Sequence, residues 1–68
     1  KPLVRITLQY SYNLDKIVIS IIKSIQGNII NQDFKEDIIS KVEVEEGLKD
    51  NFINILNEKT SGKVSILK

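Results

Sequence analysis

Two hydrophobic periods alternate along this chain, and the order in which they alternate constrains the fold more than any other feature of the sequence. The first period covers residues 3–10, LVRITLQY, where apolar residues recur at every second position. A period of two predicts a half-buried strand, because successive side chains of a strand point to opposite faces. One face carries Val4, Ile6, Leu8 and Tyr10, and the other carries Leu3, Arg5, Thr7 and Gln9.

A helical period follows the strand. The apolar residues now recur at the spacing of one helix face: Leu14, Ile17, Val18, Ile21, Ile22 and Ile25. This stripe predicts an amphipathic helix that packs on a core. We expect Asn13 or Ser11 to cap its first turn, because short polar side chains accept hydrogen bonds from free backbone N–H groups. Gly27, followed by Asn28, predicts a left-handed stop at its C-terminus.

The strand period then returns twice. Residues 28–34, NIINQDF, predict a short strand, and residues 37–45, DIISKVEVE, predict a stronger one. The intervening segment 34–37 has room for a tight reversal, so we expect a hairpin. The stronger strand places Ile38, Ser40, Val42 and Val44 on one face and Ile39, Lys41, Glu43 and Glu45 on the other.

The last third of the chain repeats the alternation. A second amphipathic helix is predicted over residues 47–60, with a stripe made of Leu48, Phe52, Ile55 and Leu56 and with Ile53 off that stripe. Residues 63–68, KVSILK, predict a closing strand with Val64 and Ile66 on one face. Gly62 between the two elements predicts a left-handed helix end.

The order β-α-β-β-α-β is the split β-α-β arrangement of the ferredoxin-like α+β fold, in which two helices cover one face of a four-stranded antiparallel sheet. Right-handed crossovers place the first and third strands in its centre. A length of 68 residues predicts one domain, residues 1–68. Because the sequence has no methionine, we expect this domain to be the C-terminal part of a longer protein that has its own N-terminal domain.

The composition excludes several kinds of site. Without cysteine or histidine the chain cannot form disulfides, thiolate metal sites or the usual histidine-based catalytic sets, so we expect no enzyme activity, metal or cofactor. No apolar run approaches the roughly 18 residues that cross a bilayer, so no membrane contact is expected. A small cysteine-free domain is typical of the reducing cytoplasm. The pI of about 8.2 is below the range of roughly 9 and above that dedicated nucleic-acid domains show.

Two motifs suggest chemistry at first reading. The segment TSGK at residues 60–63 resembles part of a phosphate loop, but Asn57 stands where such a loop needs its first glycine, and a strand follows instead of a helix. The acidic residues are better explained as a solvated group that suits the start of the second helix than as a cation site. These residues are Glu43, Glu45, Glu46 and Asp50.

The sheet face opposite the helices is the remaining candidate. It is predicted to carry Arg5, Thr7 and Gln9 beside Ile39, Lys41 and Glu43, with no aromatic residue that could stack a base. Arg5, Lys41 and Lys63 could still contact phosphates without reading a nucleotide sequence. The alternatives are an ordinary polar face or a face that packs on a partner, which the apolar residues Ile39 and Leu67 favour.

Several stretches resemble the C-terminal domain of the YigZ/Impact family. They are ITLQY before the first helix, Gly27 with IINQDF, the strand containing KVEVEE, and the second helix running into TSGK. The resemblance spans nearly the whole chain and implies a ferredoxin-like fold behind a larger N-terminal domain. It also implies a cytoplasmic protein, since the family is cytosolic, and a connection with translation, since Impact proteins are linked to translational control.

The resulting hypothesis is a non-catalytic accessory domain of a YigZ/Impact-like protein. It would bind RNA, ribosome-associated factors of the translation machinery or a protein partner through its open sheet face, for which the candidate residues are Arg5, Thr7, Gln9, Lys41 and Lys63. The alternatives are a small-molecule-sensing or homodimerisation domain, and a structural cap on the N-terminal domain.

Overall fold

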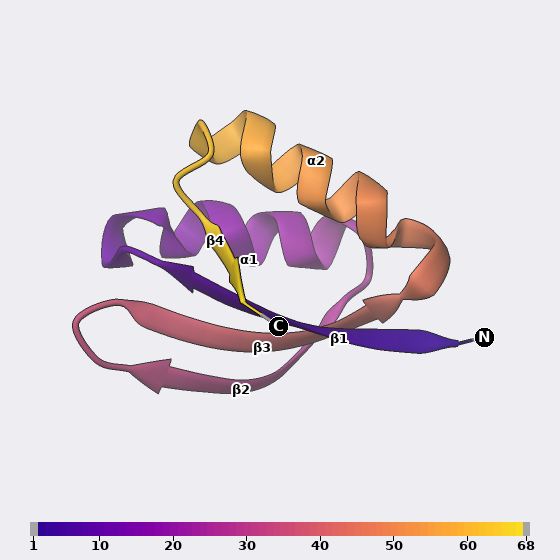
Figure 1. The fold of residues 1–68 in the computed structure, drawn as a ribbon, viewed down its shortest axis with the longest axis horizontal. Helices are drawn as coiled ribbons and strands as arrows, with labels where there is room; N and C mark the ends of the chain where they lie inside the picture. Colours follow the sequence, from indigo (N-terminus) through magenta and orange to yellow (C-terminus); the bar gives the residue numbers. More distant parts are fainter. Residues whose placement is uncertain (1, 68) are drawn as a thin grey trace.

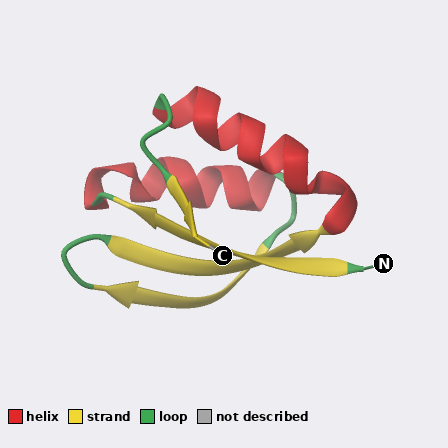
Figure 2. Cartoon of the chain, viewed as in Figure 1, coloured by secondary structure: helices red, strands yellow, loops and turns green. Residues whose placement is uncertain are grey.

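The computed structural model describes residues 2–67, which form two layers, a four-stranded sheet and a pair of helices on one of its faces (Figures 1 and 2). The strands are β1 (Leu3–Tyr10), β2 (Asn28–Phe34), β3 (Ile38–Glu45) and β4 (Ser65–Leu67). The helices are α1 (Asp15–Ser24) and α2 (Lys49–Thr60), each preceded by a 3-10 turn, η1 (Tyr12–Leu14) or η2 (Glu46–Leu48). The strand order is β2-β3-β1-β4 and all pairs are antiparallel. This confirms the predicted ferredoxin-like α+β fold.

The alternation read from the sequence sets which side chains the helices cover. In β1, Ile6, Leu8 and Tyr10 are buried while their odd-numbered neighbours stay exposed or half-buried. In β3 the buried positions are Ile38, Ser40, Val42 and Val44. The two strands pair along their full length, from Leu3 opposite Glu45 to Tyr10 opposite Ile38, so the two apolar faces form one surface.

The helices cover that surface with their apolar stripes. Val18 and Ile22 of α1 and Phe52 and Leu56 of α2 are at most 1% exposed, and they form one cluster with the buried strand residues. Ile17 departs from the prediction, because 39% of its surface is exposed at the border of the stripe. In residues 2–67 neither helix combines the length and the apolar character that a membrane crossing requires.

The start of α1 differs from the sequence-based expectation. Neither Ser11 nor Asn13 caps the helix with its side chain, because the chain first makes the 3-10 turn η1. The backbone carbonyl of Ser11, and not a side chain, accepts a hydrogen bond from the Leu14 N–H at 3.0 Å.

The end of α1 also corrects a prediction. The left-handed residue is Gln26, with a φ of 59°, and not Gly27. The position of Gly27 is explained by close packing instead, since a Cβ on this residue would lie 3.1 Å from Val44 Cγ1 and 3.2 Å from Ile22 Cγ2. Gly27 therefore lets the chain pass tightly between α1 and the sheet.

The end of α2 follows the prediction only in part. Gly62 is left-handed as expected, with a φ of 74°, but Ser61 before it is left-handed as well, with a φ of 56°. The Gly62 N–H donates to the Asn57 carbonyl at 3.0 Å and so closes the helix. The closing strand is shorter than predicted and begins at Ser65, and Lys68, the last residue of the predicted strand, lies outside the described residues.

Candidate binding face

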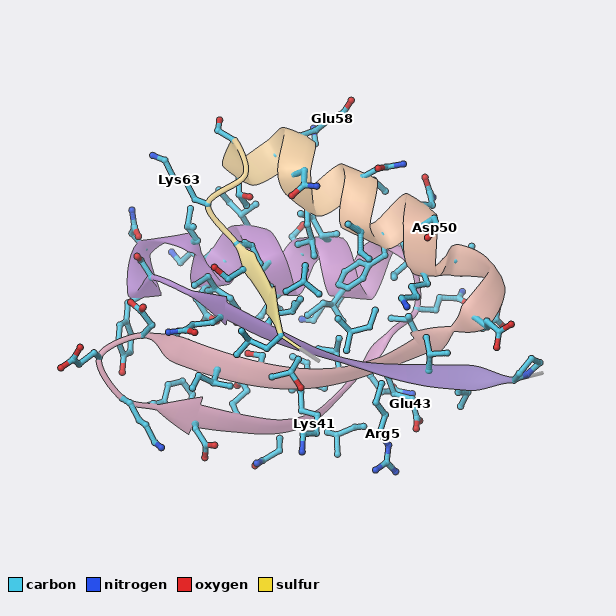
Figure 3. All side chains as sticks on the ribbon, viewed as in Figure 1. Arg5, Lys41, Glu43, Asp50, Glu58 and Lys63 are labelled. Atoms are coloured by element: carbon cyan, nitrogen blue, oxygen red, sulfur yellow. The ribbon has the colours of Figure 1, made fainter. Side chains whose placement is uncertain are left out.

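The sheet face that the helices leave open brings together most of the residues proposed from the sequence. Arg5, Thr7 and Gln9 project from β1 beside residues of β3, and the register places Arg5 opposite Glu43, Thr7 opposite Lys41 and Gln9 opposite Ile39. Figure 3 shows Arg5, Lys41 and Glu43 on the side of the sheet away from the helices. We call these six residues, with Leu67, the open face.

The charges of the open face are partly paired. Arg5 Nε lies 3.5 Å from Glu43 Oε2, and the two side chains are 68% and 25% exposed. An ion pair this exposed contributes little to stability, about 0–1 kcal/mol. Lys41 is exposed and forms no ion pair among the described residues, so it is the more available cation of the open face.

The register also accounts for the polar and apolar residues of the open face. Gln9 Nε2 donates to Asp37 Oδ2 at 3.3 Å, which ties the end of β1 to the β2–β3 turn. Leu67 of β4 lies opposite Thr7 and is 37% exposed, while Ile39 is half-buried. The face therefore mixes two apolar side chains with charges of both signs.

The structure places Lys63 apart from the open face. This residue precedes β4, in the connection from α2, and Figure 3 shows its side chain on the helix side of the molecule. Its N–H donates to the Thr60 carbonyl at 3.1 Å, as part of the helix end. Because β4 begins at Ser65, Lys63 has no strand register that could align it with Arg5 and Lys41.

The acidic residues of the sequence do not gather into a site. Glu43 belongs to the open face, while Figure 3 shows Asp50 on the helix side of the sheet. Within residues 2–67 no group of carboxylates is arranged to hold a metal ion.

A buried polar network, which the hydrophobic pattern of the sequence does not predict, lies on the helix side of the sheet. The Tyr10 hydroxyl donates to Asp15 Oδ1 at 3.0 Å and lies 2.7 Å from Ser40 Oγ. Ser40 Oγ in turn accepts a hydrogen bond from Gln32 Nε2 at 3.0 Å. Burial raises the pKa of Tyr10 above its ordinary value of 10.0. The polar residue Ser40 in an otherwise apolar row of β3 was the only signal of this network in the sequence.

The network joins β1, β2, β3 and the first turn of α1, and it is internally satisfied. Among the described residues, no buried side-chain nitrogen or oxygen lacks a hydrogen-bond partner. Polar groups that already hold one another in this way stabilise a fold and leave no donor aimed at a ligand. We therefore conclude that the network stabilises the fold, and the open face remains the candidate site.

Comparisons with known proteins bear on the fold. No family model and no curated protein matches the chain. Among solved structures, the crystal structure of a hypothetical protein superposes with a TM-score of 0.91 at 24% identity. The match covers 98% of this chain and 32% of that one, so the chain spans about a third of the length of its structural neighbour. At this identity the likeness shows the fold alone: a ferredoxin-like α+β domain.

Proposed function

We propose that this chain is a non-catalytic binding domain that contacts a protein partner through its open face. The observation that carries the proposal is the composition of that face. It places Ile39 and Leu67 among charges of both signs, including the Arg5–Glu43 pair. Protein interfaces combine apolar contact with a polar surround in this manner.

The same face is poorly suited to nucleic acid. It offers no aromatic ring on the two central strands for a base to stack on. Lys63, which we expected to add a phosphate contact, lies on the helix side, and Arg5 is beside a carboxylate. On β1 and β3, Lys41 is the one cation of the open face that does not lie opposite an acidic residue; its partner on β1 is Thr7. An RNA backbone would therefore have only this cation to contact without a competing carboxylate opposite it.

The resemblance to the YigZ/Impact family extends the proposal. The stretches ITLQY, IINQDF and KVEVEE carry that resemblance, and the fold it implies is the fold observed. On this basis we propose a cytoplasmic accessory domain of a YigZ/Impact-like protein, whose partner is a protein of the translation machinery. This step rests on the resemblance, whereas the proposed binding mode rests on the open face.

Co-sedimentation with purified ribosomes tests the translation part of the proposal. We expect the wild-type domain to sediment with ribosomes, and the double variant Lys41→Glu with Ile39→Thr to remain in the supernatant. Threonine keeps the β-branched shape that suits a strand, so this variant should fold. Lys23→Glu makes the same charge change on α1 and serves as the matched control.

A second assay separates protein binding from RNA binding. Fluorescence anisotropy with single-stranded RNA at low salt should show no saturable binding. Tight RNA binding that weakens steeply with salt, together with loss of that binding in Arg5→Ala and Lys41→Ala, would contradict a protein partner and support the RNA alternative.

A further inference from the structure

β2 forms one border of the sheet and exposes several large apolar side chains there. Among residues 2–67 no strand pairs with its outer side, and Figure 1 shows β2 along the lower border of the sheet. Ile29, Ile30 and Phe34 of this strand are exposed, and Phe34 reaches 62%. The exposed ring of Tyr12 packs on that of Phe34, with 6.4 Å between the ring centroids. We call these four residues the β2 ridge.

The sequence of β2 has few of the features that keep an exposed strand from pairing with another. Between residues 28 and 34 the single charged side chain is Asp33, and there is no lysine or proline. Exposed strand edges usually carry such residues, because they discourage the addition of a further strand. A register shift against β3 between Ile29 and Asn31 is the protective feature that β2 does have. The regular part of the edge therefore runs from Asn31 to Phe34.

The backbone of this regular part has donors and acceptors that point away from the sheet. The Lys35 N–H donates to the Asp37 carbonyl at 3.1 Å, which shows that Lys35 bonds toward the β3 side of the hairpin. In an antiparallel ladder every second residue bonds to the same side. The other odd-numbered residues of the regular part therefore also bond toward β3, whereas the N–H and C=O groups of Gln32 and Phe34 point outward.

This edge is complementary to a second copy of itself. When two copies pair antiparallel about a twofold axis at Gln32, Phe34 of each copy lies opposite Ile30 of the other. Asn31 of each copy then lies opposite Asp33 of the other, so no two like charges are directly opposed. At the axis, the outward backbone groups of Gln32 meet those of its own counterpart. One register thus matches the apolar side chains, the polar side chains and the main-chain groups.

We propose that the β2 ridge is a contact between two copies of this chain, which join their sheets edge to edge through residues 30–34. These residues span roughly 17 Å at about 3.4 Å each, enough for a short strand pair. Ile30 and Phe34 supply apolar contact, and Gln32 supplies the central main-chain hydrogen bonds. The inference goes beyond the proposed function, because the β2 ridge and the open face share no residue.

The first test measures self-association of the 68-residue chain by sedimentation velocity. The dimer fraction should rise with concentration, and the affinity should be low, because a short strand pair buries less area than a standard interface. Ile30→Lys should weaken dimerisation by about tenfold or more, since one substitution acts twice in a symmetric dimer and places charges at the edge. Ile17→Lys, at an exposed position of α1, is the matched control and should dimerise as the wild type does.

Cysteine pairs test the register, because the chain has no cysteine of its own. In the proposed dimer, Asn31 and the opposite Asp33 form a non-hydrogen-bonded pair with Cα atoms about 4.5 Å apart, within the reach of a disulfide. A mixture of Asn31→Cys and Asp33→Cys chains, one of them enlarged by a tag, should give a mixed disulfide dimer under mild oxidation. Asn31→Cys mixed with Asn54→Cys, at an exposed position of α2, should not.

Amide hydrogen exchange tests the backbone part of the contact. The N–H groups of Gln32 and Phe34 should exchange slowly only at concentrations at which the dimer forms. Those of Asn31 and Asp33 should exchange slowly at every concentration, because they bond toward β3 within one copy. Ile30→Lys should remove the concentration dependence at Gln32 and Phe34.

Three results would overturn the inference. They are a chain that stays monomeric up to millimolar concentration, equal effects of Ile30→Lys and Ile17→Lys on dimerisation, and equal crosslinking of Asn31→Cys to both partner variants. Lys41→Glu, on the open face, should leave dimerisation unchanged, so that the failure of this inference and the failure of the proposed function are distinguishable. A dimer that Lys41→Glu dissociates would instead place the contact on the open face.

Discussion

The Tyr10 hydroxyl lies 2.7 Å from Ser40 Oγ in the interior of the domain, where both residues are at most 2% exposed. β1 and β3 are thus joined by side chains on their buried face as well as by their backbone ladder. The same hydroxyl donates to Asp15 in the first turn of α1, so one group fixes the helix on the sheet. These hydrogen bonds link α1 to the two central strands that carry the open face on their other side.

Removing the Tyr10 hydroxyl should destabilise the domain. Tyr10→Phe keeps the ring but leaves Ser40 and Asp15 without their shared partner, and we expect a loss of about 1–3 kcal/mol in the free energy of unfolding. Urea unfolding measures it. Tyr12→Phe is the control, because the Tyr12 hydroxyl bonds the Lys35 carbonyl at an exposed site. Equal effects of the two substitutions would contradict the role given to the network.

Stability should fall at alkaline pH because of Tyr10. Burial raises the pKa of Tyr10 in the folded state above its ordinary value of 10.0, so the folded protein holds this proton more tightly than the unfolded chain does. The contribution is fully present below pH 10.0 and is lost as the pH rises through the folded pKa. Unfolding midpoints measured across this range should decline less steeply in Tyr10→Phe than in the wild type. An identical decline in both proteins would contradict the contribution of Tyr10 to the loss of stability at alkaline pH.

The close approach at Gly27 predicts a position-specific cost of adding one methyl group. Gly27→Ala places a Cβ 3.1 Å from Val44 Cγ1, which should cost about 1–3 kcal/mol through overpacking. Gly47→Ala is the matched control, because nothing lies within 4 Å of its Cβ position. Thermal unfolding compares the two variants. A Gly27→Ala protein as stable as Gly47→Ala would show that this packing is looser than described.

Arg5 should matter little for folding. Its side chain is 68% exposed, and the ion pair with Glu43 is open to solvent, so Arg5→Ala should change the free energy of unfolding by less than about 1 kcal/mol. Chemical denaturation measures the change. A larger loss would make Arg5 a structural residue and weaken its assignment to a binding surface.

β1, β3 and the two helices were predictable from the sequence because each of them presents one apolar face to the core. The alternation in β1 and β3 gave their buried and open residues correctly, and the stripe of α2 gave Phe52 and Leu56. The sequence pattern matches the burial pattern because the burial of apolar side chains drives folding.

The parts that were missed depend on tertiary structure or local backbone geometry. Gln26 and Ser61 adopt left-handed conformations that usually favour glycine. Neither residue type indicates such a conformation in the sequence. Lys63 was placed in the closing strand because that strand was predicted to begin at residue 63, whereas β4 begins at Ser65. A hydrophobic pattern predicts the boundaries of helices and strands less well than their type. The Tyr10–Ser40 contact joins positions 30 residues apart, which periodicity cannot pair.

The most direct test of the central claim is site-specific photocrosslinking in cells. A photoreactive phenylalanine analogue replaces Lys41 on the open face, or Ser20 on the exposed side of α1 as the control. The account predicts a discrete protein adduct from position 41, absent from position 20 and lost when Ile39→Thr is added. Adducts to RNA alone, or equal protein adducts from both positions, would contradict the claim that the open face is a protein-binding surface.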